Sequence, residues 1–121
     1  MDPFFYGRPT NVADAARRAA EPGAMVYAGG TTVLDLMKLG VYRPERVIDI
    51  TRLREPALRT VRRDGNDLVM GALVTMHQAA ENALVKAEAP AISESLWLAA
   101  SQQLRHMATL GGDVLQRTRN P

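Results

Sequence analysis

The chain has 121 residues, of which 46% are hydrophobic and 23% charged, and its formal net charge is +2. These values are typical of a globular chain with one domain or two small lobes, and they lie far from the composition of disordered proteins. The chain has no cysteine, which excludes disulfides, thiolate zinc sites and thiolate-held iron–sulfur clusters within these residues. It shows neither a membrane-spanning apolar run nor a secretory signal, so we expect a soluble, cytoplasmic protein that does not bind membranes.

Arginines dominate the basic residues and gather between positions 43 and 63. They could favour an anionic ligand or an acidic partner. Alternatively they form a solvated face together with acidic neighbours, which are Glu45, Asp49, Glu55 and Asp64. Aromatic residues do not alternate with these arginines and no nucleic-acid-binding motif is present, so we do not expect nucleic acid as a partner.

Strand and helix patterns alternate over residues 1–54, which predicts a small parallel β-α-β-α-β lobe with right-handed crossovers. Asn11 and its neighbours can cap the first helix, Thr31 or Thr32 can cap the second, and Gly40 ends it. The expected elements are a strand at 4–6, a helix at 12–20, a strand at 25–28, a helix at 33–39 and a strand at 46–50.

A second lobe is expected over residues 55–121, which makes the fold class α+β. A turn at 64–66 predicts an antiparallel hairpin, and Thr75 is expected to cap a helix that runs to Leu84. Pro90 begins an apolar pattern that predicts a helix to about Leu104, with Trp97 in the core.

Two glycine pairs are the strongest candidates for binding chemistry. Ala28-Gly29-Gly30-Thr31-Thr32 lies between a predicted strand and a predicted helix, where backbone N–H groups can hold a phosphate, or where glycine serves only a turn with positive φ. Thr109-Leu110-Gly111-Gly112-Asp113 is predicted to be a second such loop, able to contact pyrophosphate, ribose or flavin edges, or simply to cap a turn. We expect the two segments to converge in space.

Other chemistry finds little support. His77 and His106 are far apart in sequence and have no metal-binding spacing, so we expect no metal site. The serines lack a nucleophile-elbow context, and we expect no catalytic acid, base or nucleophile in this chain.

Four blocks of sequence, which span 28–38, 47–50, 71–74 and 104–112, carry a resemblance to a known family. In this order and spacing they resemble the N-terminal part of the FAD-binding subunit of molybdenum hydroxylases, the family of xanthine dehydrogenase, carbon monoxide dehydrogenase and aldehyde oxidoreductase. The resemblance implies that both glycine segments wrap FAD, which lies between two lobes. It implies the cofactor-binding residues Tyr27, Ala28, Gly29, Gly30, Thr31, Thr32, Val33, Thr109, Leu110, Gly111, Gly112 and Asp113. Asp113 departs from the asparagine most often found there.

The resemblance also implies an electron-transfer role. In that family FAD receives electrons from a molybdenum centre through [2Fe–2S] clusters and passes them to an acceptor such as NAD or oxygen, so the implied partners are a molybdenum-cofactor subunit and a [2Fe–2S] subunit. The alternative is a non-catalytic remnant or interaction module that does not bind FAD alone.

The segment 115–121 resembles periplasmic aldehyde oxidoreductases, to which a partner subunit could bring the chain. Members of that branch have a cluster-binding cysteine where Asn120 stands, so we expect no cluster here. Family members continue well beyond this length. We therefore expect residues 1–121 alone to bind FAD weakly or not at all, and to self-associate.

Overall fold

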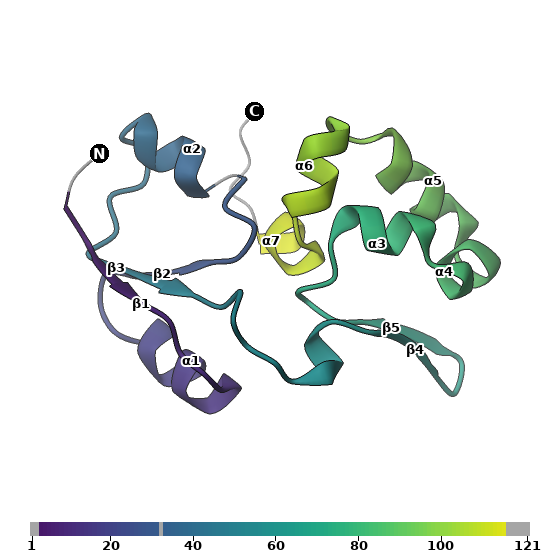
Figure 1. Cartoon of the computed structure of the whole chain (residues 1–121), viewed down its shortest axis with the longest axis horizontal. Coiled ribbons are helices and arrows are strands. Elements are labelled where there is room, and N and C mark those ends of the chain that lie inside the picture. The colour runs from purple at the N-terminus through teal and green to yellow at the C-terminus, as the bar shows by residue number, and fades with distance from the viewer. Residues whose placement is uncertain (1–2, 32, 116–121) are drawn as a thin grey trace. The chain divides into compact units, whose positions relative to one another are not determined.

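A computed structural model describes residues 3–31 and 33–115 and divides the chain into two compact units, residues 1–55 and 56–121. The first unit holds a three-stranded parallel sheet, and the second holds an antiparallel hairpin with several helices (Figure 1). The α+β prediction, with a parallel lobe followed by an antiparallel one, is confirmed. Asn120 lies outside the described residues.

The sheet of the first unit has the strand order β1-β3-β2. Its elements are β1 (Phe5–Gly7), α1 (Val12–Ala19), β2 (Ala24–Tyr27), α2 (Val33–Lys38) and β3 (Arg46–Asp49). The crossover through α1 runs along the sheet in one direction, and the crossover through α2 returns in the other. Right-handed connections of opposite direction place their helices on opposite faces of the sheet, and Figure 1 shows α1 and α2 in this arrangement.

The central strand β3 is buried because strands flank it and helices cover both of its faces. Val47 and Ile48, which point to opposite faces, are only 3% and 4% exposed. Ala15 from α1 and Met37 from α2 are buried as well. At the start of α1, Asn11 Oδ1 accepts a hydrogen bond from the amide of Asp14 at 2.8 Å, as expected of a cap.

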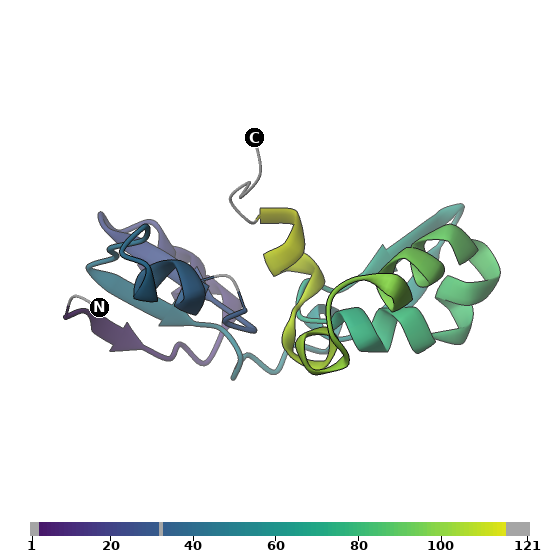
Figure 2. The same ribbon diagram turned by 90° about the horizontal axis from the view of Figure 1, so that it is seen from above.

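The second unit begins with η1 (Pro56–Leu58) and the hairpin β4 (Val61–Asp64) and β5 (Asp67–Met70). Five helices follow: α3 (Met76–Glu81), α4 (Ala83–Glu88), α5 (Pro90–Leu98), α6 (Gln102–Met107) and α7 (Leu110–Leu115). Figures 1 and 2 show helices α3–α5 gathered on one side of the hairpin. None of the helices in the described part of the chain is long and apolar enough to cross a membrane.

Two helices are shorter than the sequence predicts, because a capping residue lies inside each apolar pattern. Asn82 ends α3 and begins α4, where its Oδ1 accepts hydrogen bonds from the amides of Leu84 and Val85 at 2.9 and 3.1 Å. The predicted helix from Pro90 to about Leu104 is also interrupted. Ala100 has a φ of 55°, and Ser101 Oγ accepts from the amide of Leu104 at 3.2 Å to start α6.

The prediction that Trp97 lies in the core is wrong, although its helix α5 packs against α3 and α4. Trp97 is 48% exposed and Leu98 is 75% exposed, whereas the buried residue of this helix is Ser93. Ser93 Oγ donates to the carbonyl of Ala80 at 2.6 Å, which ties α5 to α3 through a polar contact. The guanidinium of Arg105 lies over the Trp97 ring at 5.4 Å and partly covers it.

Candidate functional site

The first glycine segment forms a tight turn between β2 and α2. Gly30 has a φ of 78°, and a Cβ atom at this position would lie 2.7 Å from both Cε2 and the hydroxyl oxygen of Tyr27. Glycine is therefore required both by the backbone conformation and by the Tyr27 ring that lies against it. Thr32, also predicted to bind the cofactor, lies outside the described residues.

The amide groups of this turn take no part in the hydrogen bonds between the described residues of the unit. The carbonyl of Gly30 accepts from the amide of Leu34 at 3.2 Å, but no group in the described residues accepts from the N–H of Gly29, Gly30 or Thr31. Unpaired N–H groups in a glycine-containing turn are donors that can hold a phosphate or another anion.

A buried carboxylate stands beside this turn. Asp49 ends β3 opposite Tyr27 in the parallel register, and it is 4% exposed. Its Oδ2 accepts from the Tyr6 hydroxyl, and its Oδ1 accepts from the Thr51 amide and hydroxyl at 2.8 and 2.6 Å. Burial alone would raise the pKa of Asp49, but these hydrogen bonds outweigh it and hold the pKa below its ordinary value.

The sequence-based interpretation that grouped Asp49 with solvated charges is therefore wrong. Its oxygens accept hydrogen bonds from Tyr6 and Thr51, so Asp49 ties these residues together at the carboxyl edge of the sheet. The sequence offers one signal of this burial, because Asp49 directly follows the apolar strand residues Val47 and Ile48.

The strand order makes this edge a favourable place for a ligand. The loops that follow β1 and β2 flank β3 and lead to helices on opposite faces of the sheet. In open α/β sheets, ligands bind in the crevice that such diverging loops leave at the carboxyl ends of the strands.

The second glycine pair is helical, which corrects the prediction of a loop at Thr109–Asp113. Helix α7 begins at Leu110 and includes both Gly111 and Gly112. Thr109 is buried and caps this helix: its Oγ1 accepts from the amide of Gly112 at 3.2 Å, and its carbonyl accepts from the amide of Asp113 at 3.0 Å.

The remaining amides of this segment are engaged by the chain between β5 and α3. Leu110 donates to the carbonyl of Val74 and Gly111 to that of Ala72, both at 2.9 Å. A Cβ atom at Gly111 would lie 3.0 Å from the Cβ of Ala72, so close packing alone accounts for this glycine. The donors expected to face a phosphate are thus occupied within the second unit.

What the second segment offers instead is an acceptor. The carboxylate of Asp113 has no hydrogen-bond or ion-pair partner among the described residues, and burial raises its pKa above the ordinary value. Such a group suits ribose hydroxyls or other donors better than a phosphate. The two glycine segments belong to different units, and their convergence stays a prediction.

The sequence matches one protein family over almost its whole length. The sequence model of the family described as "FAD binding domain in molybdopterin dehydrogenase" matches residues 2–120. The chain belongs to this family. The resemblance drawn from the four sequence blocks is thereby confirmed, and the family's name identifies FAD as its cofactor.

Curated relatives agree with this assignment. The aldehyde oxidoreductase FAD-binding subunit PaoB of Escherichia coli is 40% identical over 122 residues, which is 100% of this chain and 38% of the relative. The carbon monoxide dehydrogenase medium chain of Hydrogenophaga pseudoflava is 35% identical and is matched over 92% of this chain and 39% of its own length. The chain thus spans about two fifths of the length of these relatives.

Solved structures give the same result. Carbon monoxide dehydrogenase from Hydrogenophaga pseudoflava has a TM-score of 0.86 at 35% identity, over 94% of this chain and 40% of that one. Carbon monoxide dehydrogenase from Oligotropha carboxidovorans also has a TM-score of 0.86, at 32% identity, over 93% of this chain and 39% of its own.

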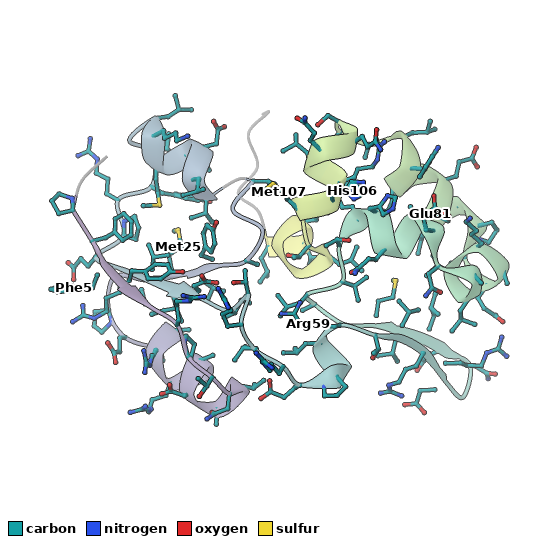
Figure 3. The ribbon with its side chains drawn as sticks, in the orientation of Figure 1. Phe5, Met25, Arg59, Glu81, His106 and Met107 are labelled. Atoms are coloured by element: carbon teal, nitrogen blue, oxygen red, sulfur yellow. The ribbon has the colours of Figure 1, made fainter. Side chains whose placement is uncertain are left out.

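In this member of the FAD-binding family, two histidines that are distant in sequence lie side by side. The rings of His77 and His106 lie 4.0 Å apart between their centroids, and Figure 3 shows His106 on the side of α6 that faces α3. Within residues 3–31 and 33–115, no third histidine, cysteine or acidic side chain joins them to form a metal-binding group. No sequence spacing signals this pair, because it depends on how α3 packs against α6.

Proposed function

We propose that this protein is the FAD-carrying electron-transfer component of an oxidoreductase complex of the molybdenum hydroxylase type. The observation that carries the proposal is the family match over residues 2–120. In such a complex the partners would be a molybdenum-cofactor subunit and a [2Fe–2S] subunit, and FAD held by this chain would link them to an acceptor such as NAD or oxygen. FAD supplies the redox chemistry when it is bound, while the chain binds and orients it.

The first glycine segment, Tyr27 to Val33, is the part of the chain that fits the diphosphate of FAD best. The N–H groups of Gly29, Gly30 and Thr31 have no acceptor among the described residues and can donate to a phosphate. The segment Thr109 to Asp113 serves another part of the cofactor, because its amides are engaged and Asp113 is an acceptor.

The alternative of a non-catalytic remnant has less support. A remnant that only binds partner proteins does not need unpaired amide donors at the carboxyl edge of its parallel sheet, where this chain keeps them. A finer part of the proposal concerns affinity: residues 1–121 studied alone bind FAD weakly, because they account for 38% to 40% of the length of the matched FAD subunits.

Flavin analysis of the full-length protein tests the proposal. The protein is incubated with FAD, freed of unbound flavin and denatured, and the released flavin is identified and quantified by chromatography. We expect FAD in about equimolar amount, since the family binds this cofactor. Release of no flavin, or of FMN from a mixture of FMN and FAD, would contradict the proposal.

A further inference from the structure

We propose that Arg8, a residue outside both glycine segments, binds a phosphate group of the flavin nucleotide. The inference rests on the proposed function and adds to it a charged ligand at the carboxyl edge of the parallel sheet. Its basis is the position of Arg8 in the fold and the exposure of its side chain, which forms no hydrogen bond or salt bridge with the described residues.

Arg8 stands at the same edge as the first glycine segment. It directly follows β1, whose last residue, Gly7, pairs with Ile48, so the next position along the strand lies beside Asp49. On the other side of β3, Tyr27 pairs with Asp49 and the glycine turn follows. Arg8 and the turn therefore begin the two loops that leave opposite sides of the central strand.

The backbone at this position is held in place. Pro9 is fully buried, and a residue before proline is restricted to extended conformations. The side chain of Arg8 is exposed, so a restricted backbone presents its guanidinium to the solvent at the sheet edge.

Arg8 lies close enough to Asp49 for its positive charge to help lower the pKa of that carboxyl, but the two side chains form no salt bridge. Arg8 forms no hydrogen bond with the described residues, whereas Asp49 accepts hydrogen bonds from Tyr6 and Thr51. By contrast, several arginines of the first unit have acidic partners: Arg17 and Arg18 pair with Asp14, and Arg46 pairs with Glu21.

An arginine would supply the positive charge that the backbone amides of the turn lack. The N–H groups of Gly29, Gly30 and Thr31 are neutral donors, whereas the diphosphate of FAD is doubly charged. A guanidinium offers a fixed fork of donors that binds phosphate with two parallel hydrogen bonds, and it supplies the positive charge.

The test compares the FAD dissociation constants of the full-length wild type, Arg8→Gln, Arg8→Lys and Arg17→Gln, measured by titration with flavin fluorescence. Arg17→Gln is the matched control, because it removes the same charge from an exposed position in the same unit while Asp14 keeps Arg18 as a partner. We expect Arg8→Gln to weaken FAD binding about tenfold or more. Arg8→Lys should fall between it and wild type, and Arg17→Gln should equal wild type.

Each other result overturns the inference. If Arg8→Gln binds FAD as tightly as wild type, Arg8 is not part of the site. If Arg17→Gln loses as much FAD affinity as Arg8→Gln, the effect is one of overall charge and Arg8 is again not part of the site. A lower melting temperature of Arg8→Gln with unchanged affinity assigns Arg8 to the support of Asp49. Absence of FAD binding by the wild type overturns the proposed function together with this inference.

Discussion

The amide of Gly111 donates to the carbonyl of Ala72 at 2.9 Å, and this hydrogen bond holds the start of α7 against the segment that leads into α3. The contact is so close that a Cβ atom at Gly111 would lie 3.0 Å from the Cβ of Ala72 and 3.1 Å from its carbonyl oxygen. Gly111 therefore has a structural role in the second unit, whatever the protein binds.

Replacement of Gly111 by valine should lower the free energy of unfolding by about 1–3 kcal/mol, because the added side chain overpacks this contact. The change is measured by urea denaturation. Gly112→Ala is the comparison, since Gly112 is exposed and its Cβ would meet only the Thr109 hydroxyl, at 3.0 Å. Equal losses in the two variants would show that the contact with Ala72 is unimportant.

Replacement of Gly30 by alanine should reduce the FAD content of the protein more than replacement of Gly40. Both glycines lie in the first unit with positive φ, 78° and 73°, so alanine costs about 1–2 kcal/mol of backbone strain in each. Only at Gly30 does the new Cβ displace the Tyr27 ring beside the open amides; at Gly40 the nearest atom is Arg43 Nη2, at 3.7 Å. Flavin released on denaturation provides the measurement, and equal FAD content in both variants would remove Gly30 from the site.

Tyr6→Phe should destabilise the first unit in a pH-dependent way, because it removes a donor from the Asp49 carboxylate. The pKa of Asp49 is lowered in the folded state, so its contribution is complete above the unfolded pKa of about 3.9 and is lost as pH falls through the folded pKa. We expect a loss of about 1 kcal/mol at neutral pH, reduced by the exposure of Tyr6, and almost none in acid.

The hydrogen bond between Tyr6 and Asp49 also predicts how the stability of the protein changes at alkaline pH. This bond raises the pKa of Tyr6, so the stabilisation is present below the unfolded pKa of about 10 and is lost as pH rises through the folded pKa. Unfolding curves of wild type and Tyr6→Phe, recorded from acid to alkaline pH, measure how the difference in the free energy of unfolding changes at both ends of the range. A difference that does not vary with pH would show that the hydroxyl contributes by packing alone.

Asp113→Asn should raise the stability of the cofactor-free protein at neutral pH and leave its stability unchanged at acid pH. Burial raises the pKa of Asp113, so folding disfavours its charged form; this cost is absent below the unfolded pKa and is complete above the folded one. Thermal unfolding at neutral pH and at about pH 3 measures the difference. Equal stabilisation at both values would attribute the effect to something other than charge.

The parallel lobe follows from the sequence because its boundaries are marked by local chemistry. Asn11 caps α1 as expected, and the glycine pair stops β2 within a residue of the predicted end. Such signals act over a few residues, so they can be recognised without knowing what packs against them.

The helices of the second unit are less predictable for a physical reason. Asn82 and Ser101 lie within runs of residues that favour helix, and the positive φ of Ala100 has no signature in an alanine. Gly111 and Gly112 predict a loop because glycine disfavours helix, but hydrogen bonds to Ala72 and Val74, distant in sequence, place the segment at the start of α7. Long-range pairing of this kind cannot be inferred from local pattern.

The most direct test of the central claim, that the turn after β2 donates to the phosphates of FAD, is an NMR titration of the full-length protein with FAD. The amide resonances of Gly29, Gly30 and Thr31 are followed together with those of Gly111 and Gly112. We predict the largest downfield proton shifts in the first group, whose N–H groups are unpaired, and small shifts in the second, whose amides are engaged within the chain. Large shifts at Gly111 and Gly112 with none at Gly29, Gly30 and Thr31 would contradict the account.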